Sequence, residues 1–431
     1  MKKFQISRDN CEILTVLRSY ALTVFLLSAF FLHSFGVSAQ SLLDVYKKGV
    51  VKLVPDTEYA KDNNWGKVFE SYYDTLYHTA MGDRKSIVLT PTGSVVVSHR
   101  YRNFYTLFDA NGKFVREFGI KDKAGKPIKE PEAMVGVMNN NLFTGLDKMG
   151  KMNCYDLNGN YVKTLALNYS AREIIPLSNN KIAVVGWSIW KNKSRDFVAI
   201  VDYETNEQKI IWDHFSPTNN PTVSHTEKGV TFETSGNITA TVDFISPSIA
   251  FVRDLLVVAL PHNGEILFYD INGNLKKKDK VSWEQKYLSV EEQKKMEKKA
   301  IEKFDLEERK KMMALGASKE NIDAWLEKMK ENMNRITTPK PLPLFSNILK
   351  DSDGNLLFFE MPETEGGNKF NVWVYQNGGQ FVCQSSFVCD DYNLVITPSK
   401  MVFHKGYIYA LQTLKNAKGN PLRLVRFKIT N

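Results

Sequence analysis

Histidine, cysteine and long apolar segments are all scarce in this sequence, and their scarcity excludes several common kinds of site. The 431 residues include 7 His and 4 Cys. No two histidines have the H-x-H or H-E-x-x-H spacing of a preformed metal or protease site. There is also no G-x-S-x-G nucleophile turn and no Walker-type phosphate loop. The sequence therefore indicates no metal, no cofactor and no local catalytic motif.

A strong excess of charge is missing as well. The formal net charge is +9, and the 57 Lys and Arg residues are interspersed with 48 Asp and Glu residues. The densest basic run, Lys276–Lys278, lies beside a predicted hairpin turn, where it is more typical of a solvated strand edge. We therefore expect no nucleic-acid partner.

The one long apolar segment lies at the N-terminus and has the features of a secretory signal. A basic region precedes the apolar residues 21–35, and the small residues Val37, Ser38 and Ala39 follow. Residues 1–39 are thus predicted to be a signal peptide, with an uncleaved anchor as the alternative. The mature chain, which has no second candidate membrane span, is expected to be exported to the periplasm or beyond the cell.

Export leaves the redox state of the remaining cysteines open. Cys383 and Cys389 could form a disulfide in an oxidising compartment, but their Cα atoms need not lie close enough. Cys154 ends a β-rich run and is predicted to be a buried, small apolar residue.

What the sequence does contain is a repeated turn between β-rich runs. An aromatic-Asp-x-Asn-Gly motif occurs three times, and weaker copies lie at residues 201–206 and 375–378. The clear copies are Phe108–Gly112, Tyr155–Gly159 and Tyr269–Gly273. Asn-Gly is the strongest two-residue hairpin signal, in which both turn residues adopt positive φ. The motif predicts a hairpin repeated along the chain.

Two of these loops also resemble calcium-binding loops, namely those that begin at Asp156 and Asp351. An EF-hand needs a glutamate at its twelfth position, where this sequence has Leu167 or Pro362. Asp and Asn also favour β-turns through local hydrogen bonds, so we interpret both segments as turns.

The spacing of the repeats predicts the architecture. Successive motif Asp residues lie just under fifty positions apart, the size of one four-stranded propeller blade. Six third strands are expected, at Tyr105–Phe108, Met152–Tyr155, Val198–Val201, Ile266–Tyr269, Val372–Tyr375 and Leu422–Phe427. The last unit lacks a fourth strand, while Val50–Val54 is a strand without a unit. We therefore predict one all-β domain, residues 40–431: a six-bladed β-propeller of four-stranded antiparallel blades, with its ring closed by the N-terminal strand.

Two segments interrupt this pattern. An extra hairpin is expected around Gly229–Phe232 and Ile238–Thr241. Residues 283–336 are predicted to be a helical insertion, whose signals are a capping box at Ser289–Glu292, a second at Asp305–Glu308, a cap at Ser318 and one apolar face formed by Ile322, Leu326, Met329 and Met333. That face must be covered, either by the propeller wall or by a partner protein.

The repeated strand–turn–strand pattern resembles the NHL-repeat type of six-bladed propeller. More closely, it resembles secreted bacterial TolB-like propellers that carry a helical insertion before the fifth blade. The resemblance covers roughly residues 80–430. It implies a fold, since the wider group includes binding scaffolds, lyases, lactonases and sugar dehydrogenases.

In such a fold, the loops between the second and third strands of each blade emerge beside the central channel. We expect ligand contacts among the polar and aromatic residues of these loops: His99, Arg100, Arg102, Asp147, Trp187, Trp190, Lys191, His262, Glu360 and Gln412. The loop Gly186–Arg195 is the richest in tryptophan and cations, which suits a glycan or a peptide.

This face leads to two functional hypotheses. The first is an exported, non-enzymatic binding or interaction module with a glycan, peptide or protein partner. The alternative is a propeller hydrolase or lyase in which polar residues from several blades meet at the channel mouth.

Overall fold

The computed structural model describes most of the chain after residue 40. The described residues are 41–69, 73–74, 79–80, 85–99, 104–128, 133–138, 142–146, 151–167, 169–190, 193–217, 223–227, 230–234, 246–314, 318–361, 368–376 and 379–431. The chain divides into two units, residues 1–44 and 45–431. Helix α2 (Leu42–Tyr46) crosses their boundary. The predicted signal peptide lies outside the described residues.

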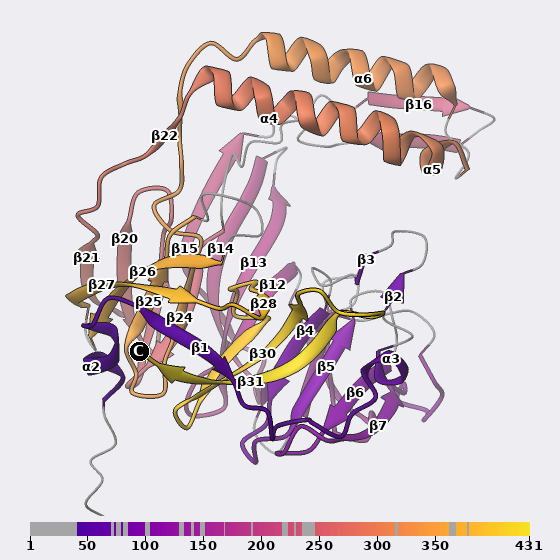
Figure 1. Cartoon of the computed structure of the whole chain (residues 1–431). Coiled ribbons are helices and arrows are strands. Elements are labelled where there is room, and N and C mark those ends of the chain that lie inside the picture. The colour runs from indigo at the N-terminus through magenta and orange to yellow at the C-terminus, as the bar shows by residue number, and fades with distance from the viewer. Residues whose placement is uncertain are drawn as a thin grey trace, which may run out of the picture. The chain divides into compact units, whose positions relative to one another are not determined.

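Four-stranded antiparallel sheets make up most of the second unit, and in each sheet the strands follow chain order (Figure 1). The first sheet has β4 (Lys85–Leu89), β5 (Val95–His99), β6 (Phe104–Phe108) and β7 (Phe114–Gly119). The second has β8 (Ala133–Met138), β9 (Leu142–Leu146), β10 (Lys151–Tyr155) and β11 (Tyr161–Ala166). The third has β12 (Ser170–Pro176), β13 (Lys181–Trp190), β14 (Lys193–Asp202) and β15 (Gln208–Pro217). The fourth has β18 (Ser248–Val252), β19 (Leu255–Ala259), β20 (Glu265–Asp270) and β21 (Leu275–Lys280).

A larger, nine-stranded sheet follows and ends the chain. Its first part has β24 (Asn347–Lys350), β25 (Leu356–Phe359), β26 (Lys369–Gln376) and β27 (Gln380–Val388). Its second part has β28 (Tyr392–Asn393), β29 (Met401–His404), β30 (Tyr407–Leu414) and β31 (Leu422–Thr430). The N-terminal strand β1 (Val51–Pro55) lies between the two parts. All six predicted third strands thus lie within strands of the structure.

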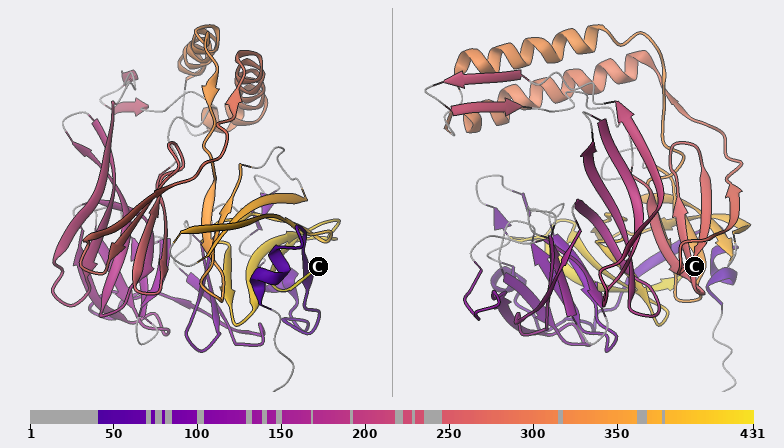
Figure 2. Two further views of the ribbon diagram at one scale, coloured as in Figure 1. Left: turned by 90° about the vertical axis from the view of Figure 1, so that its left-hand side faces the viewer. Right: turned by 180° about the vertical axis from the view of Figure 1, so that it is seen from behind.

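Strand β1 connects the two ends of the second unit. It pairs antiparallel with β31, where Leu53 lies opposite Ile429, and parallel with β27, where Val51 lies opposite Phe387. Figure 2 shows the indigo N-terminal strand beside the yellow C-terminal strands from two further sides. The polar edge of β31 is therefore covered by residues from the other end of the chain.

Successive sheets pack face to face and bury an apolar core at each contact. Their first strands touch in series, β4 with β8, β8 with β12, β12 with β18 and β18 with β24, and β29 touches β4. Between the third and fourth sheets, for example, Val185 and Val198 pack against Leu256 and Leu267. A mostly β chain with successive four-stranded antiparallel sheets is typical of β-propellers.

The repeated Asp-x-Asn-Gly turns differ from the predicted type. Gly112 has a φ of +76°, but Asn111 is not among the residues with positive φ. The Gly112 amide bonds to the Asp109 carbonyl at 2.9 Å, and the Asp109 amide bonds to the Lys113 carbonyl at 3.0 Å. This is a type I turn followed by a glycine bulge, so only the glycine needs the left-handed region.

The aspartate of the motif stabilises the turn directly. Asp109 Oδ1 accepts the backbone amides of Asn111 and Lys113, both at 2.9 Å. Asp156, Asp270 and Asp351 accept the same two amides of their own turns. The interpretation of these loops as turns is confirmed, because their carboxylates cap the local backbone.

Two of these turns, at Asp156 and Asp270, also dock on the preceding sheet. Gly159 lies against the carbonyl of Gly119, while Arg116 donates to the Leu157 carbonyl at 2.8 Å and to Asn158 Oδ1 at 2.7 Å. The motif glycine is therefore needed twice, for its positive φ and for the close approach of a neighbouring backbone.

Comparing Gly159→Ala with Gly125→Ala is expected to separate the cost of the positive φ from the cost of the close backbone approach. A Cβ atom at Gly159 would overlap the Gly119 carbonyl, whereas Gly125, with a similar φ of +75°, has nothing within 4 Å. Gly125→Ala should cost about 1 kcal/mol, the strain of a left-handed alanine, and Gly159→Ala about 2 kcal/mol more because of the overlap. Urea denaturation of both variants measures the difference. Equal losses would show that the sheets do not meet at Gly159.

The helical insertion has α4 (Val290–Lys303), a π-helical turn η4 (Phe304–Glu308), α5 (Arg309–Ala314) and α6 (Lys319–Asn334). The capping box at Ser289 and Glu292 and the cap at Ser318 are confirmed. The second predicted capping box is wrong: Asp305 lies inside the continuous helix and pairs with Arg309.

The apolar face of α6 is covered within the insertion itself. Ile322, Leu326 and Met329 are buried and pack with Ile301 of α4. The two helices run side by side in Figures 1 and 2. Two amphipathic helices in one segment can bury each other's apolar face. The sequence predicted only the propeller wall or a partner protein as the cover for this face. Short strands β22 (Tyr287–Leu288) and β23 (Lys340–Pro341) pair where the insertion begins and ends.

One smaller prediction is corrected, and one question left open by the sequence is answered. The extra hairpin pairs β17 (Val230–Thr234) with the preceding β16 (Val223–Glu227). Residues 229 and 238–241 of the prediction lie outside the described part. Cys383 and Cys389 are both free thiols. Cys383 lies in β27 and Cys389 directly follows that strand, so about 20 Å of extended chain separates them.

Candidate functional site

The structure describes only some of the residues that were expected to bind a ligand. Arg100, Arg102, Asp147 and Lys191 lie outside the described residues. His99 and Trp190 are the last residues of β5 and β13, and their side chains also lie outside the described part. The site must therefore be built from Trp187, His262, Glu360 and Gln412 and their neighbours.

The predicted tryptophan loop is a hairpin of long strands. Trp187 lies within β13, opposite Ser170 of β12 and Asp196 of β14, and Trp190 lies opposite Lys193. The prediction of a loop at 186–195 is wrong because this hairpin extends beyond the usual blade length. Both strands reach ten residues.

Trp187 is part of a cluster of charged side chains on the third sheet. Arg172 of β12 lies over its indole ring, 5.9 Å from the centroid, and donates to Asp196 Oδ1 at 2.7 Å. Arg172 also bonds to Ser246, which precedes the fourth sheet. Burial raises the pKa of Asp196, and the charge of Arg172 offsets only part of that rise. The cluster thus holds a cation on an aromatic face at the contact of two sheets.

His262 lies in the predicted position, between β19 and β20 of the fourth sheet. Burial lowers its pKa, and the nearby basic groups His214 of β15 and Lys340 of β23 lower it further. Leu344 donates its amide to the Pro261 carbonyl at 2.8 Å, which ties this loop to the segment after the insertion. Basic groups from three elements therefore share this part of the surface.

Glu360 directly follows β25, also in the predicted connection. Its Oε1 accepts the indole N–H of Trp373 at 2.7 Å, and its Oε2 lies 3.3 Å from Lys286 Nζ and 3.4 Å from Asn371 Nδ2. Burial raises its pKa, but the bonds from Trp373, Lys286 and Asn371 outweigh burial and leave it below the usual value. Glu360 is thus a fixed anion that binds the start of the insertion.

Gln412 is not a loop residue. It lies inside β30 and is 1% exposed. Its Oε1 accepts the Val395 amide at 2.6 Å and its Nε2 donates to the Val395 carbonyl at 3.1 Å. A buried carboxamide must satisfy its own donors and acceptors, and here the backbone of Val395 does so. Gln412 positions residues 394–396 instead of facing a ligand.

Sequence reasoning missed Arg172, Asp196, Lys286 and Trp373. Arg172 and Asp196 lie inside strands, where a charged residue ordinarily faces solvent. Both lie next to Trp187 only because the strands pair in this register. One signal was available: charged residues lie in both strands that flank the segment containing Trp187 and Trp190.

Among the described residues, no group of three or more His, Cys, Asp or Glu side chains is placed to hold a metal ion. No helix in the same part of the chain is long and apolar enough to cross a membrane.

Comparison with known proteins gives structural similarity only. No family model and no curated protein matches the sequence. A member of the DUF4221 family from Bacteroides vulgatus is 12% identical, over 89% of this chain and 99% of its own, with a TM-score of 0.47. A protein of Bacteroides fragilis described as a candidate exported protein is 11% identical, over 80% and 95%, with a TM-score of 0.42. BamB from Moraxella catarrhalis is 11% identical, over 79% and 84%, with a TM-score of 0.31.

Proposed function

We propose that this chain is an exported, non-enzymatic binding protein of the NHL- and TolB-like kind, located in the periplasm or outside the cell. Its ligand is a glycan or a peptide. The ligand binds where the third, fourth and fifth sheets bring their second-to-third strand connections together. The observation that carries this proposal is the stack of Arg172 on Trp187, fixed by Asp196.

Further groups of the same face support binding. His262, His214 and Lys340 supply basic groups, while Glu360 and Trp373 offer an anion and an aromatic surface. Aromatic faces beside fixed charges bind sugars and peptides without needing a reactive group. The two charged pairs are held by protein contacts, Asp196 with Arg172 and Glu360 with Lys286, so the face is preorganised.

The scaffold in this proposal is a closed six-bladed propeller. Its blades are the four four-stranded sheets, the set β24–β27, and a last set in which β1 is the fourth strand beside β31. The contacts between first strands and the pairing of β1 with β31 support this arrangement. A closed ring leaves few free strand edges, and it gathers loops from every blade at one face.

Removing the Trp187 ring tests the binding face. With a fluorescently labelled protein on an array of oligosaccharides and synthetic peptides, we expect Trp187→Ala to lose at least about tenfold in affinity for the ligands that wild type retains, because a stacking surface is lost. Tyr161→Ala is the matched control, since Tyr161 is a partly exposed aromatic residue of the outer strand β11 in the second sheet. Its binding should be unchanged.

Thermal melting of the same variants distinguishes a ligand contact from a packing residue. Trp187→Ala is expected to lose only about 1 kcal/mol of stability, as is usual for a partly exposed residue. If Trp187→Ala binds as well as wild type, or if it unfolds, the proposed face is wrong.

One observation favours the hydrolase or lyase alternative. Glu173, beside Arg172 in β12, has a buried Oε1 for which the described residues offer no hydrogen-bond partner, and burial raises its pKa to about 8. A carboxyl group that stays protonated at neutral pH is a common general acid. Turnover of ester, lactone or glycoside substrates by wild type, lost in Glu173→Gln, would favour the enzyme over the binding module.

A further inference from the structure

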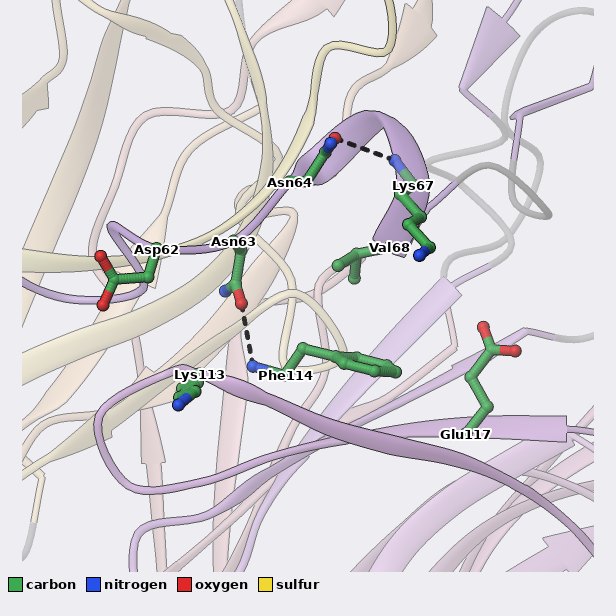
Figure 3. Close-up of a pocket in the computed structure, with 8 residues that line it drawn as sticks. All are labelled: Asp62, Asn63, Asn64, Lys67, Val68, Lys113, Phe114 and Glu117. Carbon is green, nitrogen blue, oxygen red and sulfur yellow. Dashed lines mark hydrogen bonds between the residues drawn. The ribbon is translucent and has the colours of Figure 1, made fainter.

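A separate pocket lies at the outer edge of the first sheet, away from the residues of the proposed binding face in sequence and in sheet order. Its lining comes from the segment after β1, which includes helix α3 (Trp65–Val68), and from β7. The residues are Asp62, Asn63, Asn64, Lys67, Val68, Lys113, Phe114 and Glu117 (Figure 3). The pocket volume is about 550 Å³, within the range of small-molecule sites.

Hydrogen bonds hold the two walls of the pocket in place. The Asn63 side chain donates to the Gly112 carbonyl at 2.7 Å and accepts the Phe114 amide at 2.9 Å. The Ala60 amide donates to the Asn111 carbonyl at 2.9 Å. Asn64 caps α3 by accepting the Lys67 amide at 3.2 Å. The backbone around the pocket is thus fixed before any ligand arrives.

Two opposite charges face the same space in this pocket. Figure 3 shows the ends of Lys67 and Glu117 on the same side as the Phe114 ring and near Val68, with Asp62 and Lys113 at the other end. Neither Lys67 nor Glu117 has an ion-pair partner within 4.0 Å among the residues that the structure describes. They are thus too far apart to neutralise each other, although an apolar surface joins them.

The environment of Glu117 favours a cationic ligand group. Burial is the one cause of the raised pKa of this carboxyl group. Glu117 is an exposed residue of β7 with no ion-pair partner among the described residues, so an ammonium group bound in the pocket would supply its counterion. Lys67 can do the same for a carboxylate at the opposite end of a ligand.

We propose that this pocket binds a small zwitterion, an amino acid or dipeptide with an apolar side chain. Its ammonium group meets Glu117, its carboxylate meets Lys67, and its side chain lies on Phe114 and Val68. The balance of two amines and two carboxylates in the lining suits a ligand of no net charge. A purely anionic or cationic ligand would satisfy one end and be repelled at the other.

The test uses L-leucine and L-leucyl-L-leucine with the purified chain, measured by saturation-transfer NMR and calorimetry. We expect millimolar binding of at least one of them. N-acetyl-leucine, which lacks the ammonium group, and leucine amide, which lacks the carboxylate, should each bind about tenfold more weakly, the cost of one lost charged hydrogen bond. Glu117→Gln and Lys67→Gln should weaken binding of the intact zwitterion by a similar factor.

Matched controls come from the same segment. Glu58 and Lys61 form an exposed ion pair of 2.7 Å outside the pocket lining, so Glu58→Gln and Lys61→Gln should leave binding unchanged. The proposal is overturned if neither leucine nor dileucine binds at 10 mM (about the weakest useful affinity). It is equally overturned if the blocked ligands bind as well as the free ones, or if the control variants weaken binding as much as Glu117→Gln. The blocked ligands are compared on the wild-type chain, so this outcome does not depend on the folding of any variant.

Discussion

Arg426→Ala is expected to destabilise the fold by about 3–5 kcal/mol, the usual cost of breaking a buried ion pair from one side. Arg426 donates from Nε and Nη2 to Asp56 Oδ2 at 3.0 and 2.6 Å, and the Asp56 side chain is 6% exposed. Asp56 directly follows β1, and Arg426 lies in β31. The pair therefore joins the two ends of the chain where β1 meets the last strand.

The surroundings of Arg426 make the loss larger than that of a single ion pair. Its guanidinium lies 4.7 Å from the ring centroids of both Tyr59 and Tyr407. Asp56 Oδ1 also lies 3.6 Å from Lys428 Nζ, and the Asp56 amide donates to the Arg426 carbonyl at 2.8 Å. Arg426→Ala would leave Asp56 buried without its main counterion and would open a space between two tyrosine rings.

The matched control is Arg195→Ala. Arg195 makes the same pair of bonds, from Nε at 3.1 Å and Nη2 at 2.7 Å, to Asp213 Oδ2, but the two side chains are 25% and 39% exposed. That variant should lose less than about 1 kcal/mol. Guanidinium denaturation of both variants, and of Arg426→Lys, measures the difference in the free energy of unfolding. Arg426→Lys should recover little of the lost stability, because a lysine side chain cannot make both hydrogen bonds to Asp56.

A similar small loss of stability in the Arg426 and Arg195 variants would mean that β1 does not depend on this pair.

The dependence of stability on pH gives a second check on the Asp56–Arg426 pair. Burial would raise the pKa of Asp56, but Arg426 outweighs it and lowers the pKa. The stability from the pair should be full above the unfolded value near 3.9 and fall as pH drops through the lowered pKa. Arg426→Ala should remove that fall.

Glu173→Gln is expected to stabilise the protein by about 3 kcal/mol at pH 7. Burial raises the pKa of Glu173 to about 8, and although part of the side chain is accessible, its Oε1 is buried. At neutral pH the unfolded chain has an ionised Glu173 that must take up a proton on folding. Glutamine has nearly the same shape and no such requirement.

The sign of the effect can be followed with pH. An acid with a raised folded pKa contributes stability that is full below the unfolded value near 4.3 and is lost as pH rises through the folded value. Wild type should therefore lose stability between about pH 4 and 8, and Glu173→Gln should lose less over that range.

Exposed Glu284 supplies the control. Thermal melts from pH 4 to pH 9 (about the range that the two pKa values span) compare Glu173→Gln and Glu284→Gln with wild type. The control should follow wild type throughout. Lower stability of Glu173→Gln at pH 7 would contradict a neutral, buried carboxyl group.

The sequence by itself determined the local parts of this protein. The Asp-x-Asn-Gly motif predicted the turns at Asp109, Asp156 and Asp270, in which a carboxylate caps amides two and four residues along, because all the atoms involved lie within one turn. Ser289 and Ser318 predicted helix starts for the same reason, since a cap bonds to amides within three residues. The spacing of just under fifty residues between Asp109, Asp156 and Asp202 also predicted four-stranded units.

The tertiary structure decided whatever depends on residues far apart in the chain. Only the long hairpin of β13 and β14 places Trp187 against Asp196 and Arg172, and only strand pairing across the chain ends brings Asp56 to Arg426. The sequence predicted Gln412 as a ligand contact in a loop, whereas in the structure its side chain is hydrogen-bonded to the backbone of Val395. Such contacts depend on register and packing between sheets, and a sequence pattern specifies which face a residue lies on without specifying what lies opposite.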